Sequence, residues 1–280
     1  MTPAINPVNR FYVSPEYSVF YRRVKKLSWQ NQTTSDYALL STLTGTLNYR
    51  VGDASGQLSG GKSLVLPPNS ILGVETEQAE FVFLNFRSSL LVQHAVTMKL
   101  VPMDATVSFI PEPLDTHSRL AGLFRDFTSE LLSERPGKEI VMRALVQQVM
   151  VEILRTYART QRSAELEFSR VGIIDRRIRR SVELMHTQLD QDLSLRDLAA
   201  ASYLSPFHFA RLFKKITGAT PHNYLAAIRA NRAQLMLAET DVSITEIGSR
   251  VGYLSASHFT KAFRLATGTT PREFRKALVS

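Results

Sequence analysis

The sequence predicts a multidomain α+β protein, with a small β-barrel or sandwich and its following helices in the N-terminal part and an all-α domain in the C-terminal part. Two observations support this fold class. Between about residues 15 and 110, short strand-like runs are separated by Gly, Pro, Asn and Asp. Near the other end, a 19-residue segment that begins at Tyr203 recurs from Tyr253 with 10 identical positions, which indicates a duplicated unit.

Length and composition limit the class of protein. A chain of 280 residues with 44% hydrophobic residues is long enough to bury a sizeable core and is expected to form two domains. The chain contains no cysteine, which excludes disulfides, thiolate zinc sites and cysteine nucleophiles. We find no targeting pattern and no apolar run of membrane-spanning length in the sequence, and therefore expect a soluble, cytoplasmic protein without a membrane partner.

The barrel is predicted from four strand-like runs, which are Tyr37–Ser41, Thr46–Val51, Ser63–Leu66 and Phe81–Phe86. Aliphatic and aromatic residues dominate these runs, and turn-forming residues lie between them. Residues 52–56, Gly-Asp-Ala-Ser-Gly, are the candidate hairpin turn. Several short strands at such spacing are typical of a small sandwich or barrel.

Helical periodicity follows between about residues 115 and 160. One apolar stripe is formed by Leu120, Phe124, Phe127 and Leu131, and a second by Ile140, Ala144, Val149, Ile153, Leu154 and Tyr157. The break at 134–137 predicts two antiparallel helices, which could close the barrel or pack against a second subunit. Residues 161–173 are polar and lose the periodicity, so we predict an interdomain linker there and a first domain at residues 1–160.

The first repeat unit, about residues 193–218, has the element order of a helix-turn-helix. Ser194 and Asp197 form a capping-box pattern, and the short helix they open is expected to bury Leu195, Leu198 and Ala199. Ser205 followed by Pro206 predicts the start of the second helix, which ends at Gly218. The apolar face of this helix is formed by Phe209, Leu212, Phe213 and Ile216, and its outer face by Phe207, Ala210, Arg211, Lys214 and Lys215.

The second unit, about residues 243–268, repeats this pattern. Ser243 with Glu246 forms a capping-box pattern, as does Thr270 with Glu273 just beyond the unit. Phe259 and Phe263 are predicted to be buried. The outer face of the second helix is then formed by Ala256, Ser257, Thr260, Lys261 and Arg264.

A longer helix is predicted between the two units, from Pro221 to about Ala238. Its length would be about 25 Å, so two recognition helices at its ends could enter successive turns of a major groove, about 34 Å apart. For Arg229 and Arg232 on this helix, contact with the DNA backbone and pairing within the protein are equal alternatives.

The charge of the chain is concentrated in the duplicated part. Residues 1–174 contain 18 Lys and Arg against 16 Asp and Glu, a net charge of +2, whereas residues 175–280 contain 16 against 9, a net charge of +7. Both nucleic acids and anionic membrane surfaces attract such a domain. The helix-turn-helix geometry favours DNA.

These residues carry a resemblance to a known family. From residue 174 to residue 280 the chain resembles the DNA-binding domain of AraC/XylS-family bacterial transcriptional regulators, above all in the runs Ile247-Gly248, Gly252-Tyr253, His258-Phe259 and Gly268-Thr269-Thr270-Pro271. The resemblance implies double-stranded DNA as a partner. It also implies base contacts by Phe207, Ala210, Arg211, Ser257, Thr260 and Lys261, and phosphate contacts by Lys214, Lys215 and Arg264. For Arg211 and Lys261, surface salt bridges are the alternative.

The N-terminal part resembles the cupin-like effector barrel that precedes this domain in many family members, through its strand rhythm, Gly45 and Gly60-Gly61. Catalytic cupins use several histidines and a glutamate to bind a metal. Here the region holds His94, and His117 lies beyond it. We therefore expect no metal, no cofactor and no enzymatic activity, and keep a metal-dependent cupin enzyme fused to a DNA-binding domain as a remote alternative.

The resemblance implies a dimeric transcriptional regulator controlled by a small molecule in the barrel. Trp29, Tyr37, Tyr49 and Arg87 are the candidate effector-binding residues, because rings offer apolar faces and Arg offers a bidentate fork to a small aromatic or carboxylated metabolite. Their alternative role is in the core or surface of a β-domain. The competing function is a DNA-binding regulator without an effector, whose activity is set by its abundance or by a protein partner. RNA polymerase is an expected partner if the protein is an activator.

Overall fold

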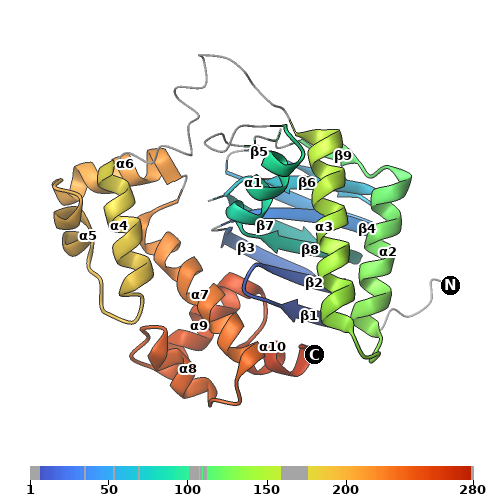
Figure 1. Ribbon diagram of the computed structural model, residues 1–280. Helices are drawn as coiled ribbons and strands as arrows, with labels where there is room; N and C mark the ends of the chain where they lie inside the picture. Colours follow the sequence, from blue (N-terminus) through green and yellow to red (C-terminus); the bar gives the residue numbers. More distant parts are fainter. Residues whose placement is uncertain are drawn as a thin grey trace.

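The computed structural model describes residues 7–158, except 35, 53, 69, 101–106, 108, 110 and 111, and residues 176–278, except 218. A sheet domain with three helices and a helical domain lie side by side (Figure 1). The predicted linker, residues 161–173, lies outside the described residues.

The sheet domain is built from nine strands: β1 (Val8–Val13), β2 (Tyr17–Val24), β3 (Leu27–Thr33), β4 (Tyr37–Val51), β5 (Ala54–Ser59), β6 (Lys62–Leu66), β7 (Ile71–Thr76), β8 (Ala79–Phe86) and β9 (Leu114–Asp115). One sheet has the order β1-β2-β8-β4-β6-β9, and the other pairs β3 with β7, β7 with β4 and β4 with β5. All of these pairs are antiparallel. Because β4 belongs to both, the two sheets face one another across a shared core.

Strand β4 shows how the sheets are joined. The sequence suggested two strands, Tyr37–Ser41 and Thr46–Val51, whereas the structure has one long strand with a register shift between Thr42 and Thr44. Gly45 follows at φ +77°, and a Cβ there would lie 2.3 Å from the backbone oxygen of Gln78. The glycine therefore permits the bend that carries one strand from the first sheet into the second.

A hairpin lies at the predicted turn, but it is tighter than the predicted 52–56, because Val51 pairs with Ala54 and Ala54, Ser55 and Gly56 belong to β5. The sheet also begins earlier than the expected residue 15, since β1 pairs along its whole length with β2. Strand β1 is hard to predict from the sequence, because the polar residues Asn9 and Arg10 interrupt its apolar residues.

Three helices cover the outer face of the first sheet: α1 (Ser88–Thr97), α2 (Ser118–Leu132) and α3 (Lys138–Tyr157) (Figure 1). The first predicted stripe, from Leu120 to Leu131, is fully buried against the sheet. The second is buried only from Val149 onward. Ile140 is 75% exposed and Ala144 is also exposed, so the start of this stripe does not pack against the sheet of its own chain.

The helical domain contains α4 (Arg176–Thr187), α5 (Leu195–Ala201), α6 (Pro206–Thr217), α7 (Pro221–Glu239), α8 (Ile244–Arg250), α9 (Ala256–Thr267) and α10 (Pro271–Ala277). Helices α5 and α6 form the first helix-turn-helix, and α8 and α9 form the second. The capping boxes at Ser194 and Thr270 are both present. Leu195, predicted to be buried, is 43% exposed, because it is the first residue of α5 and projects beyond the packed turn.

The two units differ in their cores. The first unit packs with α4 and the start of α7 around Phe209 and Phe213. The second packs in the same cluster as the inner faces of the sheets, where Phe259 and Phe263 join Phe20 and Phe83. The sheet domain and the second unit therefore share one hydrophobic core.

Aromatic and charged contacts reinforce this interface. The ring of Phe11 stacks on Phe274 with centroids 4.8 Å apart. Arg22 is 2% exposed and lies against the rings of Phe11 and Trp29. Its guanidinium donates a hydrogen bond to the carbonyl of Thr267, at the C-terminal end of α9. The positive side chain thus lies at the negative end of the helix dipole.

Among the described residues, no helix is both long and apolar enough to span a membrane.

Candidate nucleic-acid interface and interdomain cavity

Helix α6 presents the first candidate recognition surface. The hydroxyl of Ser205 accepts a hydrogen bond from the backbone N–H of His208, 3.4 Å away, and Phe209 and Phe213 fix the inner side. Phe207, Arg211 and Lys214 are exposed, and Ala210 is half-buried between them. Positions 207, 210, 211 and 214 share one face of a helix. For Lys215, the structure describes the helical backbone alone.

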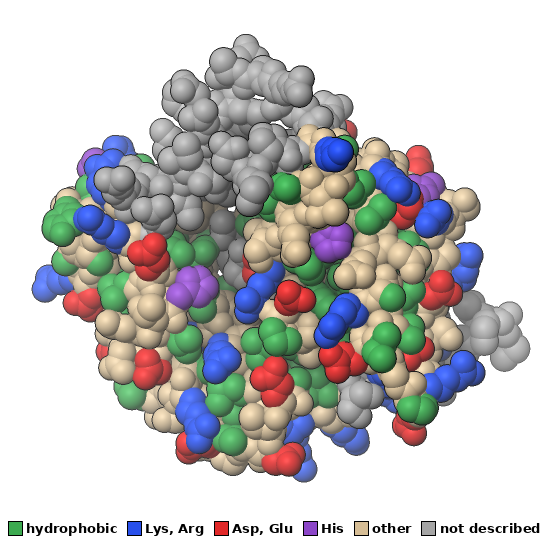
Figure 2. All heavy atoms as spheres, viewed as in Figure 1, with side chains coloured by type: hydrophobic (Ala, Val, Ile, Leu, Met, Phe, Trp, Pro, Cys, Tyr) green, Lys and Arg blue, Asp and Glu red, His purple; other side chains and the backbone are tan. Residues whose placement is uncertain are grey.

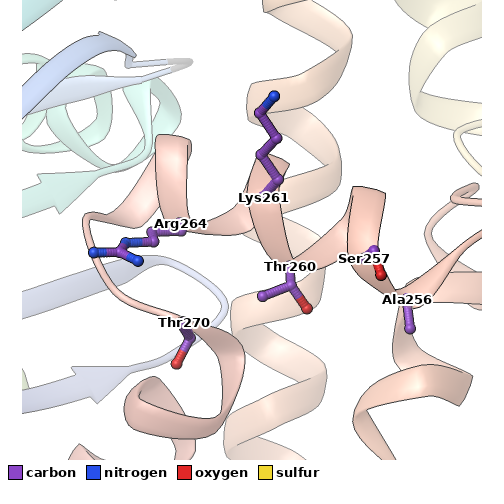
Figure 3. A pocket seen from close by; sticks show the side chains of 6 residues that line it. All are labelled: Ala256, Ser257, Thr260, Lys261, Arg264 and Thr270. Atoms are coloured by element: carbon purple, nitrogen blue, oxygen red, sulfur yellow. The ribbon is translucent and has the colours of Figure 1, made fainter.

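Helix α9 presents the second surface with the same spacing. Ser257, Lys261 and Arg264 are exposed, and Thr260 is half-buried. These residues project from one side of the helix, together with Ala256 at its start (Figure 3). At an offset of 50, Lys261 corresponds to Arg211 and Arg264 to Lys214. Each helix therefore carries two cations one turn apart, while the neutral pair changes from Phe and Ala to Ser and Thr.

A shallow groove of about 480 Å³ runs along the second surface. Its lining includes Thr270, at the start of α10, which the sequence indicated only as a helix cap (Figure 3). The N–H and hydroxyl of Thr270 both bond to the carboxylate of Glu273. These bonds lower the pKa of Glu273, and the positive charges of Arg264 and Arg22 lower it further.

The turns of the two units differ in length. Residues 202–205 connect α5 to α6, whereas residues 251–255 connect α8 to α9, which is one residue more. The left-handed position is Tyr203, at φ 53°, in the first turn and Gly252, at φ 86°, in the second. Tyr203 is exposed and lies against Arg180, while Tyr253 lies against Arg229. The alternative of pairing within the protein is therefore observed for Arg229.

A cavity of about 840 Å³ lies between the sheet domain and the helical domain. Its apolar part is formed by Phe20, Trp29, Phe83 and Leu235, and its polar part includes Glu16, Asp36, Arg87, His186 and Arg232. Asp36 accepts a hydrogen bond from the N–H of Ser88. Burial and the positive charge of Arg87 lower the pKa of His186, whereas the negative charge of Asp36 acts to raise it.

The structure brings two of the four candidate effector residues together. Trp29 and Arg87 both line the interdomain cavity. Tyr37 is buried on the opposite side of the sheet, where its hydroxyl bonds to the carbonyl of Val107. Tyr49 is buried in the core between the sheets, with its ring against Gly56. The sequence missed His186, Arg232 and Asp36, because these cavity residues come from distant segments that share no motif.

The histidines of the sheet domain have local roles. A ring nitrogen of His94 lies 2.8 Å from the carbonyl of Leu90, and His117 caps α2. In the described part of the chain, no three histidine, aspartate or glutamate side chains are grouped to hold a metal ion.

Basic side chains do not dominate every surface. On the face drawn in Figure 2, Lys and Arg are interspersed with Asp and Glu over both domains. The cations of α6 and α9 are distinguished by their matched spacing along the two helices.

Comparison with known proteins supports the assignment of the helical domain as a helix-turn-helix domain. Residues 198–277 match the family model described as a helix-turn-helix domain. Over 125 residues the chain is 30% identical to the HTH-type transcriptional regulator MtrA of Neisseria gonorrhoeae, which covers 44% of this chain and 42% of MtrA. It is 26% identical over 108 residues to the lactose operon transcription activator of Staphylococcus xylosus, covering 39% of this chain and 38% of that relative. These matches span less than half the length of each curated relative.

Solved structures extend the likeness to the whole fold. A structure of apo ToxT from Vibrio cholerae has a TM-score of 0.64 at 11% identity, covering 96% of this chain and 100% of ToxT. Another ToxT structure, bound to an unsaturated fatty acid, has a TM-score of 0.59 at 11% identity and covers 95% and 96%. A third is bound to (E)-4-(8-methylnaphthalen-1-yl)but-3-enoic acid.

Fold and site together define a two-domain protein with a duplicated helix-turn-helix. More particularly, its C-terminal domain contains the region that matches the helix-turn-helix model, and a sheet domain precedes it in the arrangement seen in ToxT.

Proposed function

We propose that this chain is a cytoplasmic, sequence-specific DNA-binding transcriptional regulator controlled by a small-molecule effector. The observation that carries the proposal is the pair α6 and α9, which present the same four helical positions at the two ends of α7. Helix α7 has 19 residues and a length of about 28 Å, which suits two recognition helices in successive major-groove turns. The match to a helix-turn-helix model and the transcriptional regulators among the relatives support it.

The two faces would divide the work of recognition. Arg211 and Lys261 would contact bases, because their donors suit the acceptors of guanine in the major groove. Phe207, Ala210, Ser257 and Thr260 would contact neighbouring base edges. Lys214, Lys215 and Arg264 would contact phosphates, which carry affinity without sequence information.

Selection of duplexes from a random pool tests this function. The best site is then titrated at several salt concentrations with the wild type, Arg211→Ala and, as a control far from α6, Arg125→Ala on α2. We expect an enriched motif, with Arg211→Ala losing about 1–3 kcal/mol of discrimination at a few positions and Arg125→Ala behaving as wild type. Salt-sensitive binding without sequence preference would contradict the proposal.

We propose the interdomain cavity as the effector site. The rings of Phe20, Trp29 and Phe83 would contact an aromatic or aliphatic body, and Arg87 would pair with a carboxylate. The ligands bound to ToxT are both carboxylic acids, which supports this class of ligand. Phe20, Trp29 and Phe83 also belong to the packed cluster on the inner faces of the two sheets, so part of the core of the sheet domain lines the cavity.

The single tryptophan of the chain provides the test. Because Trp29 lines the cavity, a bound acid is expected to change its fluorescence, and the change should saturate. Arg87→Met should weaken the binding of fatty and aromatic carboxylates, with the corresponding alcohols as uncharged controls. If no carboxylate changes the fluorescence or the DNA affinity, the alternative of a regulator without an effector is favoured.

We further propose a homodimer formed through the start of α3. Ile140 is 75% exposed, the neighbouring Val141 is 41% exposed, and Leu132 at the end of α2 is 46% exposed. Ile140→Asp should shift the chain toward monomer in sedimentation equilibrium, whereas Gln93→Asp on α1 should not.

RNA polymerase would be a partner if the chain activates transcription. The relatives are regulators, so we propose no enzymatic activity, and a metabolite turned over by the metal-loaded chain would contradict this.

A further inference from the structure

We propose that Arg229 is a positioning residue that fixes the distance and rotation between the two recognition helices, and that it thereby selects operators by the spacing of their half-sites. The proposal rests on the proposed DNA-binding function, and it assigns to a residue of α7 a role in specificity without contact with DNA.

Arg229 lies where α7 passes from one unit to the other. Tyr224, Leu225 and Ile228 belong to the core of the first unit, whereas Ala233 and Leu237 belong to the core of the second. The helix is rigid over its length, but each unit packs on its own half. The relative rotation of the units therefore depends on what joins them near the middle of α7.

The side chain of Arg229 joins both units at once. Its Nε donates a hydrogen bond of 2.8 Å to the carbonyl of Leu189, and Nη2 donates one of 2.8 Å to the carbonyl of Gln191. Both carbonyls belong to the segment between α4 and α5, which leads into the first unit, while the side chain of Leu189 packs against the core of the second. The guanidinium also lies 5.2 Å from the ring centre of Tyr253, in the turn of the second unit.

The second turn is shaped around this side chain. Gly252 adopts φ +86°, and a Cβ at this residue would lie 2.6 Å from Nη2 of Arg229 and 2.6 Å from the carbonyl oxygen of Leu189. An L-residue would be strained at this φ and would also displace the junction. In the second turn the left-handed residue is Gly252, and Tyr253 follows it. In the first turn, which is one residue shorter, Tyr203 itself is the left-handed residue, and its ring lies against Arg180.

A guanidinium suits this role better than an ammonium group. Its planar fork holds two acceptors in fixed directions while its face packs on an aromatic ring. Burial lowers the pKa of Arg229, and the nearby charges of Asp192 and Asp190 oppose this effect. Three independent contacts in different directions leave little freedom for rotation of one unit relative to the other.

The geometry of DNA makes such rigidity selective. Adding one base pair between half-sites moves the second by about 3.4 Å along the axis and rotates it by about 35°, since one turn holds about 10–10.5 base pairs. A rigid pair of helices can match one spacing, and a loose pair can tolerate several. A residue that fixes the junction therefore changes specificity even though it contacts no base.

The test uses duplexes with the two half-sites selected by the wild-type protein, spaced at the selected distance, one base pair shorter and one longer, and a duplex with a single half-site. The wild type should prefer the selected spacing sharply. Arg229→Met should lose about tenfold at that spacing and little at the others, with single-site affinity unchanged. Arg125→Met, the same substitution on α2, should keep the wild-type preference.

Two further variants distinguish the loss of the contacts of Arg229 from misfolding of the domain. Arg229→Lys keeps the charge but cannot hold both carbonyls, and Gly252→Ala disturbs the junction from the opposite side. Both should flatten the spacing preference, with circular dichroism reporting the fold. An unchanged preference in folded Arg229→Met and Arg229→Lys would overturn this proposal alone. A wild-type protein that selects no motif would instead overturn the proposed function, and this inference with it.

Discussion

The two helix-turn-helix units began as one sequence pattern, yet they are held in different ways. Both have a capped support helix, a turn and a recognition helix with two buried phenylalanines. The first unit completes its core with α4 and α7. The second completes its core with the inner faces of the two sheets. Duplication therefore preserved the scaffold, while the partner of each scaffold diverged.

The segments that follow the recognition helices show the same divergence. Thr220-Pro221 opens α7, which is 19 residues long, and Thr270-Pro271 opens α10, which has 7 residues. Helix α7 continues to the next unit, whereas α10 docks on β1 through Phe274 and Phe11. The sheet domain therefore contacts the helical domain chiefly at its second unit.

The strongest test of this difference removes equivalent core rings. Phe213 and Phe263 correspond at an offset of 50 and are 0% and 1% exposed. Each change to Ala should cost about 3–5 kcal/mol. Phe263→Ala should lower the urea midpoint seen by Trp29 fluorescence, because Trp29 belongs to the same cluster. Phe213→Ala should destabilise α5 and α6 in hydrogen exchange and leave the Trp29 transition unchanged.

An equal shift of the Trp29 transition in both variants would mean that the units unfold as one body. The difference between the two cores would then have no energetic consequence for the sheet domain.

Arg22 offers a second test, confined to the interface of the second unit. Burial lowers its pKa to about 10, and the charge of Glu273 offsets this only in part. Arg22→Met keeps the packing between Phe11 and Trp29 and removes a buried charge, so stability should change by no more than about 1 kcal/mol. Arg22→Ala also removes the aliphatic stem and should cost about 3 kcal/mol. Urea unfolding of both variants distinguishes packing from charge, and equal losses would contradict this division.

The turns provide a smaller contrast. Tyr203 adopts a left-handed φ of 53° while 77% exposed, a conformation that costs an L-residue about 1–2 kcal/mol. Asn tolerates it better, so Tyr203→Asn should stabilise the first unit by up to about 1 kcal/mol after the loss of the contact with Arg180. Hydrogen exchange in α5 and α6 would slow. Tyr253→Asn removes the ring that lies against Arg229 and should destabilise the second unit. Slower hydrogen exchange in α8 and α9 of this variant would contradict the comparison.

The helical domain was predictable because its signals are local. Caps such as Ser194 and Thr270, and phenylalanines at helical spacing, depend on neighbours within one turn, and the repeat offers each pattern twice. The sheet domain was predictable only in outline. Strand β1 and the continuity of β4 depend on partners distant in the sequence, and the bend at Gly45 is set by the backbone of Gln78.

The site divides in the same way. The outer faces of α6 and α9 followed from helical period, and their roles in DNA recognition stay predictions. The interdomain cavity did not follow, because Trp29, Arg87 and His186 meet only when two domains pack. The role of Arg229 was also hidden, since pairing with backbone carbonyls leaves no pattern in the sequence.

The smallest expected effect concerns the protonation of His186 on α4, the helix that packs with the first unit and lines the cavity facing the sheet domain. Burial and Arg87 lower the pKa of His186, against the influence of Asp36. The unfolded chain therefore binds this proton more readily, so stability is complete above the ordinary histidine range and is lost as pH falls through it. Urea unfolding at stepped pH between about 8 and 5 should show this slope, and His186→Gln should reduce it while the exposed His208→Gln leaves it intact. A slope that survives His186→Gln unchanged would mean that this residue does not couple α4 to the sheet domain. The first unit would then be even more independent of the sheet domain than its separate core indicates.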